Sequence, residues 1–455
     1  MQNGIQLSTF RNWLHELIDA RLLGIYRILF GLFMTYNMFR YFRIGLIENM
    51  FVHPRINFSY DGFYWLKPLP EVYLNILLGA LLICGCLIAA GIFFKWACRF
   101  FAFGYLYLFL LDKSIYNNHI YLFILMAFLL SFTDADKVFS LKAKASAGYL
   151  IPRWQQVILQ IQIVLVYFFG GIAKLTHDWI FNAEPIRSMV GFLNHEPLLQ
   201  SFLDNEVAIF MLNYGGLALD LGAPLLLWYK PFRKWSVWLF IVFNFTNSRL
   251  FQDIGIFPFV MLVNLILFYE VHELPWLKAR KTLVKTKVKS VKSDLSTSTS
   301  LLQHNPWTRN LLIGYFIFQL IFPLRGHFLP NPLDWTTIGN RFSWRMKVDT
   351  RSTEEMKFYI QSSDFDAPVP VDIHTFINDM QIQNISMDPR SVRDFAMFLE
   401  QEAILYQTND PEIKANIRIQ YNGREPVNFV DSLVDLSNVQ YTPFKRLSWV
   451  EDVPR

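Results

Sequence analysis

The sequence predicts a polytopic α-helical membrane bundle of about nine spans, followed by a small extracytoplasmic α+β domain. Hydrophobic residues make up 53% of the 455 residues and aromatic residues 17%, with a positive mean hydropathy. Charged residues make up only 17%, below the roughly 25% that is usual for soluble domains. The apolar residues fall into separate runs, and the composition becomes that of a soluble domain from about residue 340.

The apolar runs locate the expected spans, although several are shorter than the roughly 20 residues that a straight crossing needs. We expect a transmembrane helical bundle over residues 1–271, containing the catalytic pocket, and a last span over 306–325. Charges interrupt residues 1–20, so a cleavable signal peptide is not expected and the first span should act as the targeting signal. The individual runs cover 22–42, 71–94, 98–111, 118–131, 156–176, 206–228, 234–250, 255–270 and 308–323.

The distribution of lysine and arginine between the loops predicts the orientation, because positively charged loops stay in the cytoplasm. If the N-terminus is cytoplasmic, the outer loops before the C-terminal region carry few basic residues, namely Arg43, Arg55, Lys67, Lys113 and Arg187. The inner loops then receive Lys95, Arg99, Lys137, Lys142, Lys144, Arg153, Lys230, Arg233 and Lys234. We therefore expect a cytoplasmic N-terminus and a C-terminal domain on the extracytoplasmic side.

Residues 272–305 are basic and then rich in serine and threonine, which predicts a cytoplasmic linker that rests on anionic lipid headgroups. No aromatic interleaving accompanies its lysines, so no nucleic-acid partner is expected. Residues 326–455 are expected to form the α+β domain, with strands over 356–360 and 417–421 and a helix over 391–406. The three cysteines, Cys84, Cys86 and Cys98, all lie in or beside apolar runs and predict neither a disulfide framework nor a metal site.

The stretch from Leu111 to His119 (LDKSIYNNH) is the most informative part of the chain because it places Lys113, two amides and an imidazole between two apolar runs. A charged group beside the hydrocarbon core of a membrane is costly and is a functional hypothesis by default. Burial disfavours the ammonium form, and a neutral amine is a base. In the alternative interpretation, Lys113 ends a helix and its charged group extends into water.

Other polar residues interrupt apolar runs at Arg27, Lys174, Asp220 and Asp134. Charges in lipid should face the interior of a bundle and pair, so each of these residues taken alone can be explained as part of a structural ion pair. Taken together, they predict a polar pocket near Lys113 that opens to the outer side.

Several motifs occur in a fixed order along the chain, and the ordered set is more specific than any one of them. It comprises Pro68-Leu69-Pro70, Leu111 to Leu122 with Phe132 to Asp136, Tyr167 to Leu175 with Asp178-Trp179, Asn247 to Phe251, Asp334-Trp335 and Phe342 to Met346. The set resembles the vitamin K-dependent γ-glutamyl carboxylases, whose membrane part is the horizontally transferred transmembrane (HTTM) domain. The lack of a cysteine on the expected outer side, and Asn244 where many relatives carry a histidine, indicate a bacterial member.

The resemblance implies a carbon–carbon lyase with reduced vitamin K (the hydroquinone) as cofactor and O₂ and CO₂ as co-substrates. Lys113 would deprotonate the hydroquinone, and O₂ would convert it to a strong base that abstracts a glutamate γ-hydrogen. CO₂ would then add, and vitamin K epoxide would leave. The C-terminal domain would hold the Glu-containing protein or peptide.

The remaining candidate site residues are inferred from their positions in the sequence. Asn117, Asn118 and His119 would hydrogen-bond the oxygens of the hydroquinone. Lys174 or Arg27 would stabilise anionic intermediates, and Asn247 completes the expected cofactor-binding set.

Two other functions stay open at this point, as does the oligomeric state. The protein could oxidise a quinol to its epoxide without carboxylating glutamate, a difference that the sequence hardly reveals. It could also be a transporter, because broken spans and intramembrane charges occur in that class, although the two halves of the chain show no convincing repeat. Instead of holding a protein substrate, the C-terminal domain could be a lid that only packs on the bundle.

Overall fold

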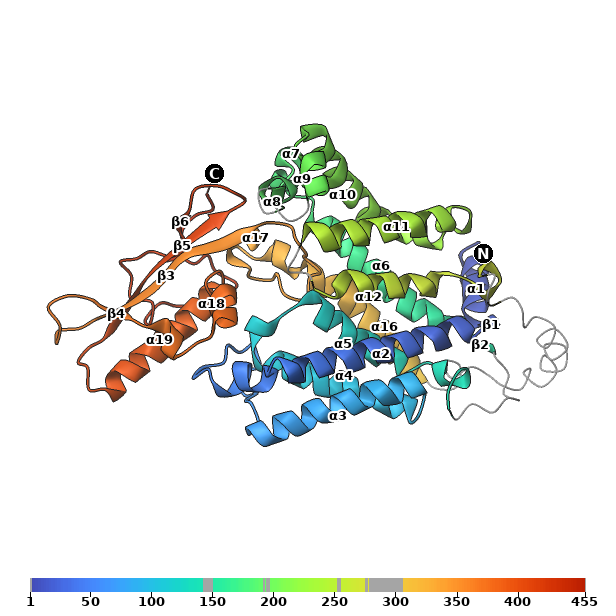
Figure 1. Ribbon diagram of the computed structural model, residues 1–455, viewed down its shortest axis with the longest axis horizontal. Coiled ribbons are helices and arrows are strands. Elements are labelled where there is room, and N and C mark those ends of the chain that lie inside the picture. Colours follow the sequence, from blue (N-terminus) through green and yellow to red (C-terminus); the bar gives the residue numbers. More distant parts are fainter. Residues whose placement is uncertain are drawn as a thin grey trace.

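A computed structural model describes residues 2–141, 150–190, 193, 197–251, 255–274, 277 and 306–454. The expected linker over 272–305 falls almost entirely outside these residues. A helical bundle forms one end of the molecule and the C-terminal domain forms the other, with the sheet strands β3 to β6 beyond the ends of the bundle helices (Figure 1).

Within the described residues, six helices are long and apolar enough to cross a membrane, so the chain is a multi-pass membrane protein. They are α2 (Arg21–Arg43), α3 (Glu71–Ala90), α4 (Phe94–Leu111), α6 (Trp154–Ala173), α10 (Glu206–Trp228) and α16 (Pro306–Ile321), which is continued by the 3₁₀ helix η8 (Phe322–Phe328).

The expected number of about nine spans is not confirmed, although helices are present at all nine expected places. The other three are α5 (Asn118–Leu130), α11 (Lys230–Leu250) and α12 (Phe257–Asn264), which is continued by η6 (Leu265–Phe268). With 13 residues, α5 is about 20 Å long, whereas the hydrocarbon core of a bilayer is about 30 Å thick. Basic residues at both ends of α11, from Lys230 to Lys234 and at Arg249, shorten its apolar stretch.

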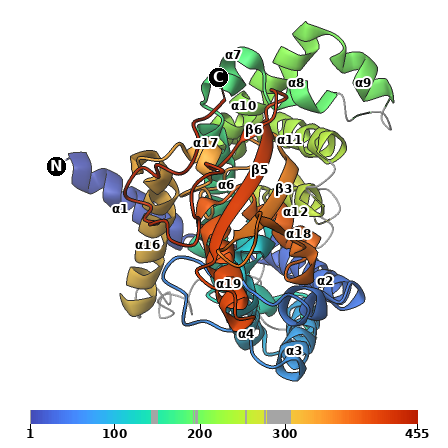
Figure 2. The same ribbon diagram turned by 90° about the vertical axis from the view of Figure 1, so that its left-hand side faces the viewer.

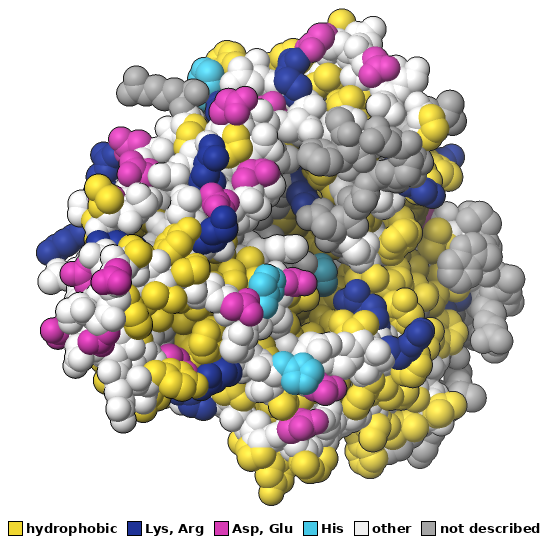
Figure 3. Space-filling view, turned by 60° about the vertical axis from the view of Figure 1, so that its left-hand side comes forward, with side chains coloured by type: hydrophobic (Ala, Val, Ile, Leu, Met, Phe, Trp, Pro, Cys, Tyr) yellow, Lys and Arg dark blue, Asp and Glu magenta, His cyan; other side chains and the backbone are white. Residues whose placement is uncertain are grey.

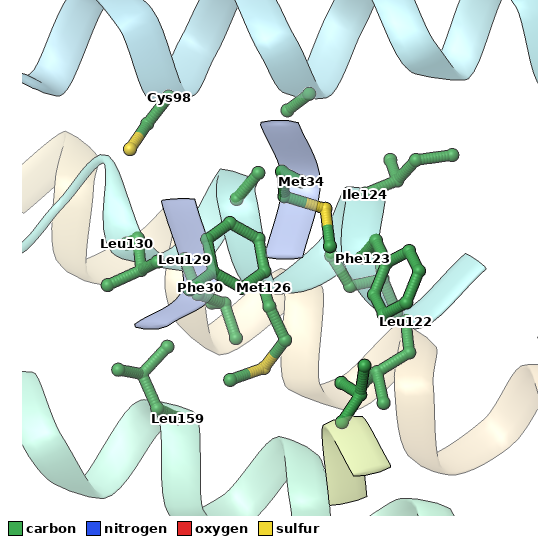
Figure 4. Packing of buried hydrophobic residues seen from close by; sticks show 14 of the residues in the cluster. Phe30, Met34, Cys98, Leu122, Phe123, Ile124, Met126, Leu129, Leu130 and Leu159 are labelled. Atoms are coloured by element: carbon green, nitrogen blue, oxygen red, sulfur yellow. The ribbon is translucent and has the colours of Figure 1, made fainter. Parts of the chain in front are cut away.

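The short helix α5 lies at the centre of the bundle. Every residue from His119 to Leu130 except Phe128 is buried, so the helix is apolar and covered on all sides. Its side chains pack among Phe30 and Met34 of α2, Cys98 of α4 and Leu159 of α6 (Figure 4). A helix that is hydrophobic all round is enclosed by protein. The start of α5 is therefore held at a fixed place inside the structure.

Shorter elements connect and cover these helices. The pair β1 and β2 is antiparallel, and α8, α9 and the start of α10 form a small apolar cluster with Leu250 and Phe251. The elements are α1 (Gln2–His15), β1 (Leu17–Asp19), η1 (Glu48–Val52), η2 (Lys113–Ile115), η3 (Ala135–Lys137), β2 (Leu150–Pro152), α7 (His177–Asn182), α8 (Ile186–Met189), α9 (Pro197–Leu203) and η7 (Val271–Glu273).

The C-terminal domain is built on an antiparallel sheet with strand order β4-β3-β5-β6, beside helices α18 and α19 (Figure 2). Its elements are α17 (Leu333–Thr336), β3 (Arg351–Gln361), β4 (Val369–Val371), η9 (Ile373–Thr375), α18 (Asp379–Ile385), α19 (Pro389–Leu405), β5 (Glu412–Tyr421) and β6 (Val427–Asn428). The two predicted strands and the predicted helix are confirmed as β3, β5 and α19. Charged side chains gather over this domain, whereas hydrophobic ones dominate the neighbouring surface of the bundle (Figure 3).

Among the contacts that attach the C-terminal domain to the bundle, two sets lie next to the cavity described below. Trp344 stacks on Tyr121 of α5 with ring centroids 4.8 Å apart, and the Phe342 backbone N–H donates to the Tyr116 hydroxyl at 2.6 Å. On the other side, Arg424 donates to both carboxylate oxygens of Asp178 at 2.9 and 2.7 Å. The domain is thus fixed at the start of α5 and at α7.

Close packing of α2 on α3 depends on glycine, and it gives a first prediction. A Cβ at Gly31 would lie 2.7 Å from Ala89 Cα, so Gly31→Ala should force the two helices apart and destabilise the fold by about 1–3 kcal/mol. Thermal unfolding of the purified protein in detergent measures this loss. Gly79→Ala is the matched control, because its nearest new neighbour would be Phe42 Cζ at 3.8 Å. Equal unfolding temperatures for the two variants would contradict the prediction.

Candidate active site

A cavity of about 530 Å³ lies where α6, α10, α11 and α12 meet the segment between α17 and β3. Its size falls in the range of roughly 300–1,000 Å³ that is typical of small-molecule sites. Five of the predicted cofactor-binding residues line it, namely Asn117, Asn118, His119, Lys174 and Asn247. Most of the remaining wall is apolar, and the polar side chains converge from several elements, as expected for a site that orients a largely apolar ligand.

Local capping orders the corner that leads into α5. The Asp112 carboxylate accepts from the Ser114 backbone N–H at 2.8 Å, and the Asn117 side chain accepts from the His119 backbone N–H at 3.2 Å. Asn118 accepts from the Tyr116 hydroxyl at 2.9 Å and donates to the Arg345 carbonyl at 3.0 Å. Asparagine at such a position satisfies helix N–H groups that would otherwise lack a partner. The two amides therefore fix the corner from which His119 faces the cavity.

Lys113 lies beside this corner, buried against the C-terminal domain rather than in the cavity wall. Its Nζ is 3.3 Å from Asp388 Oδ2, and the two side chains are only 4% and 7% exposed. The same carboxylate oxygen accepts from Arg341 Nη1 at 2.6 Å. Arg341 also lines the cavity, so it connects the Lys113–Asp388 pair to the cavity wall.

The charges of these groups depend on one another. Burial lowers the pKa of Lys113 below its ordinary value; the Asp388 carboxylate opposes this effect, and the Arg341 guanidinium adds to it. Burial alone would raise the pKa of Asp388, but Lys113 and Arg341 outweigh it and hold that pKa at about 2. Asp388 therefore stays ionised at physiological pH, next to a lysine whose ammonium form is disfavoured by burial.

Lys174 forms an ion pair on the far wall of the cavity. Its Nζ is 2.5 Å from Asp220 Oδ2 and lies 4.8 Å from the ring centroid of Trp179. The expected pairing of these two charges is present. Trp179 also lines the cavity, and among the described residues its buried Nε1 has no hydrogen-bond partner.

Arg27 is not brought to the cavity. It is fully buried near the C-terminal ends of α3 and α5, at the opposite end of α5 from Asn118. Its guanidinium donates to backbone carbonyls rather than to a carboxylate, at Ile88 (2.6 Å), Ala89 (2.5 Å), Ala135 (3.2 Å) and Phe139 (2.8 Å). Arg27 therefore caps the end of α3 and hydrogen-bonds the segment that follows α5. Asp134, the other predicted partner in an ion pair, contacts Lys95 at 2.8 Å and Lys137 at 3.2 Å.

The sequence analysis missed Asp388 and Arg341. Asp388 precedes Pro389 at the start of α19, and its side chain accepts from the Ser391 backbone N–H at 3.2 Å. Aspartate followed by proline is a recognisable helix start, so its capping role could have been predicted. Its contact with Lys113 could not, because only the docking of the C-terminal domain brings the two residues together. No group of three or more His, Cys, Asp or Glu in the described part of the chain could hold a metal ion.

Comparison with known families agrees with this architecture. Residues 15–272 match the HTTM domain, which defines the class of the membrane part. Residues 304–455 match the lumenal domain of vitamin K-dependent gamma-carboxylase. The chain belongs to the vitamin K-dependent γ-carboxylase family. No solved structure matches the chain, and the expected bacterial origin stays a prediction.

The contacts of Arg27 predict a structural role that is separable from the site. Arg27→Gln should leave several buried carbonyls without donors, at about 1–3 kcal/mol for each unsatisfied group, and should lower the unfolding temperature in detergent. The affinity of the remaining folded protein for a quinone should be unchanged. Arg43→Gln, at the exposed end of the same helix, is the control. Normal stability combined with weaker quinone binding would instead place Arg27 in the ligand site.

Proposed function

We propose that this protein is an integral-membrane vitamin K-dependent γ-glutamyl carboxylase. It would add CO₂ to the γ-carbon of glutamate in a protein or peptide and couple this step to epoxidation of reduced vitamin K. One observation supports the proposal most directly. Lys113, to which the resemblance assigns the role of starting base, is buried beside the polar corner of the cavity, in a chain that matches both domains of the family.

The cavity suits a ligand with oxygen atoms on its ring and an apolar tail. Asn117, Asn118 and His119 lie together in its wall, and Lys174 lies against the ring of Trp179 in another part of the wall. Reduced vitamin K, when bound, would supply the oxidisable ring whose reaction with O₂ yields a base strong enough to remove a γ-hydrogen. A lysine amine cannot do so directly, because its pKa reaches only about 10.4 in water.

Lys113 would accept the first proton at Nζ, which requires the neutral amine. Burial favours that form, and loss of the ammonium charge would weaken the attraction to Asp388. The released side chain could then turn toward the cavity, with Arg341 remaining as the partner of Asp388. Once Lys113 has taken the proton, the carboxylate of Asp388 would stabilise the new ammonium. Asp388 is therefore proposed as the residue that tunes the proton affinity of Lys113.

The walls of the cavity would keep water from the reacting groups. Phe243, Phe251 and Phe257 line it together with Trp179, and apolar walls of this kind exclude the water that would quench a strong base or reprotonate a carbanion. Lys174 would face the anionic stage of the reaction, with Asp220 balancing its charge beforehand.

On the side of the C-terminal domain, residues from Thr337 to Arg351 line the cavity. We place the glutamate substrate there, held by residues 326–455. In this arrangement the N-terminus is cytoplasmic and the C-terminal domain extracytoplasmic. Support comes from Lys95, Lys137 and Arg153, which lie around the end of α5 and the start of α6, away from that domain.

A coupled assay tests the function and the role of Lys113. Purified protein in detergent should convert reduced vitamin K, O₂, labelled bicarbonate and a Glu-rich peptide to epoxide and fixed label. Lys113→Ala should lower both products by about 10²–10⁴-fold, the usual contribution of a positioned acid or base. The variant should fold, because Asp388 keeps Arg341 as its partner.

Lys67→Ala, at an exposed lysine, is the matched control and should retain both activities. If epoxide forms without fixed label, the protein oxidises the quinol but does not carboxylate glutamate. If the wild-type protein forms neither product, the carboxylase proposal is wrong and solute flux in proteoliposomes becomes the next measurement.

The contact between Asp388 and Lys113 predicts a shift in the pH profile. Epoxidation should rise with pH as Lys113 loses its proton. Asp388→Asn removes a charge that raises the pKa of Lys113, so the rising limb should move to lower pH by about one unit or more. Asparagine still caps α19, so the fold should persist. Asp394→Asn should shift the rising limb in the same direction by a smaller amount. If the rising limb of Asp388→Asn stays in place or moves to higher pH, the proposed role of Asp388 is wrong.

A further inference from the structure

The cavity reaches the surface of the bundle along the seam between α10 and α11. Met211, Leu239 and Val242 line the cavity, yet they are 67%, 52% and 60% exposed, so one side of each faces the cavity and another faces the surroundings. Met211 and Gly215 lie four residues apart on one stripe of α10, and Leu239 and Val242 lie on one stripe of α11. The two stripes form the lips of an opening in the side of the bundle.

Glycine keeps this seam narrow but open. A Cβ at Gly215 would meet nothing within 4 Å, so the lip has free space at that position. A Cβ at the neighbouring Gly216 would meet the Phe243 ring at 3.4 Å, which shows that α10 and α11 approach each other just beneath. Two bulky residues here would fill the gap between the lips.

Both helices are anchored behind the seam to the same neighbour, α6. Lys174 at the end of α6 pairs with Asp220 of α10 at 2.5 Å, and Asn244 of α11 donates to the Tyr167 hydroxyl of α6 at 3.1 Å. The polar contacts therefore lie on the inner side, whereas the lips carry apolar side chains and Gly215, and the same stripe of α11 continues to Thr246. Since α10 is long and apolar enough to cross the membrane, we place this exposed apolar side of the bundle against lipid.

We propose that the seam between α10 and α11 admits and holds the apolar tail of a lipid-soluble quinone, whose ring lies at the polar end of the cavity. This inference rests on the proposed function, because the quinone is its cofactor. A peptide would not use this route, since its backbone polar groups would lack partners in the hydrocarbon region. In this proposal the tail enters from the lipid, and the polar substrate reaches the cavity from the side of the C-terminal domain, where residues from Thr337 to Arg351 line it.

The test compares one substitution at two glycines that have equally free surroundings. Gly215→Phe fills the lip, and Gly314→Phe adds the same ring to α16, where a Cβ also meets nothing within 4 Å and the cavity is not involved. The probes are oxidised vitamin K with a long isoprenoid tail and the same naphthoquinone ring without a tail. Quenching of tryptophan fluorescence in detergent measures binding without any turnover.

Gly215→Phe should weaken binding of the tailed quinone about tenfold and leave the tail-free ring within about twofold of wild type. Gly314→Phe should change neither. A photoreactive group at the end of the tail should label Met211, Leu239 or Val242 in the wild-type protein. The seam is not the tail site if Gly215→Phe affects both probes equally or affects neither. The same conclusion follows if the photoreactive group labels only other helices, or if the wild-type protein binds neither quinone.

The coupled assay separates this proposal from the proposed function. If the tail occupies the seam but no epoxide forms from the hydroquinone, the reaction fails and the binding site stands. If epoxide forms but Gly215→Phe does not discriminate between the two probes, the reaction stands and the tail site is wrong.

Discussion

One buried carboxylate determines the geometry of the candidate site. Asp388 begins helix α19, contacts Lys113 at 3.3 Å and accepts from Arg341 at 2.6 Å, so three segments that are distant in the sequence meet at its oxygen atoms. Removing any one charge from such a group leaves another buried and less compensated, which is costly in a protein interior. The docking of the C-terminal domain therefore determines which charges surround Lys113.

The length of α5 adds a second constraint. A helix of about 20 Å that is covered on all sides begins within the protein rather than in a solvated loop, so its polar start is held by side-chain caps and by the C-terminal domain. Trp344 and Phe342 close this region, and both residues have positive φ, at 58° and 64°. Such a backbone is strained for non-glycine residues and persists only where the surrounding packing fixes it, here against Tyr121 and Tyr116.

The fold was largely predictable because its strongest signals are local. Apolar runs predicted the positions of the bundle helices, and the spacing of apolar residues in the C-terminal domain predicted α19, β3 and β5. The number of spans was not predictable, since α5 and α12 look apolar enough but are too short, and only the three-dimensional structure shows that α5 is surrounded by protein. For the site, polar residues within apolar runs gave five lining residues of the cavity. The same pattern, a polar residue within an apolar run, led to the wrong prediction that Arg27 lies at the site. A sequence does not distinguish an arginine that caps helix ends from one that faces a ligand.

The position of Lys113 follows from competing requirements on a base that is buried in a membrane protein. Lys174 lies in the cavity wall and is paired with Asp220 there, whereas Lys113 lies outside the wall with a partner from the C-terminal domain. In the proposed mechanism, Lys113 would have Asp388 as its partner before the reaction and would return to that partner after gaining a proton. Arg341 contacts both the carboxylate and the cavity, so a ligand that displaces Arg341 also changes the charge balance at Lys113. The arrangement thereby links occupancy of the cavity to the proton affinity of the base.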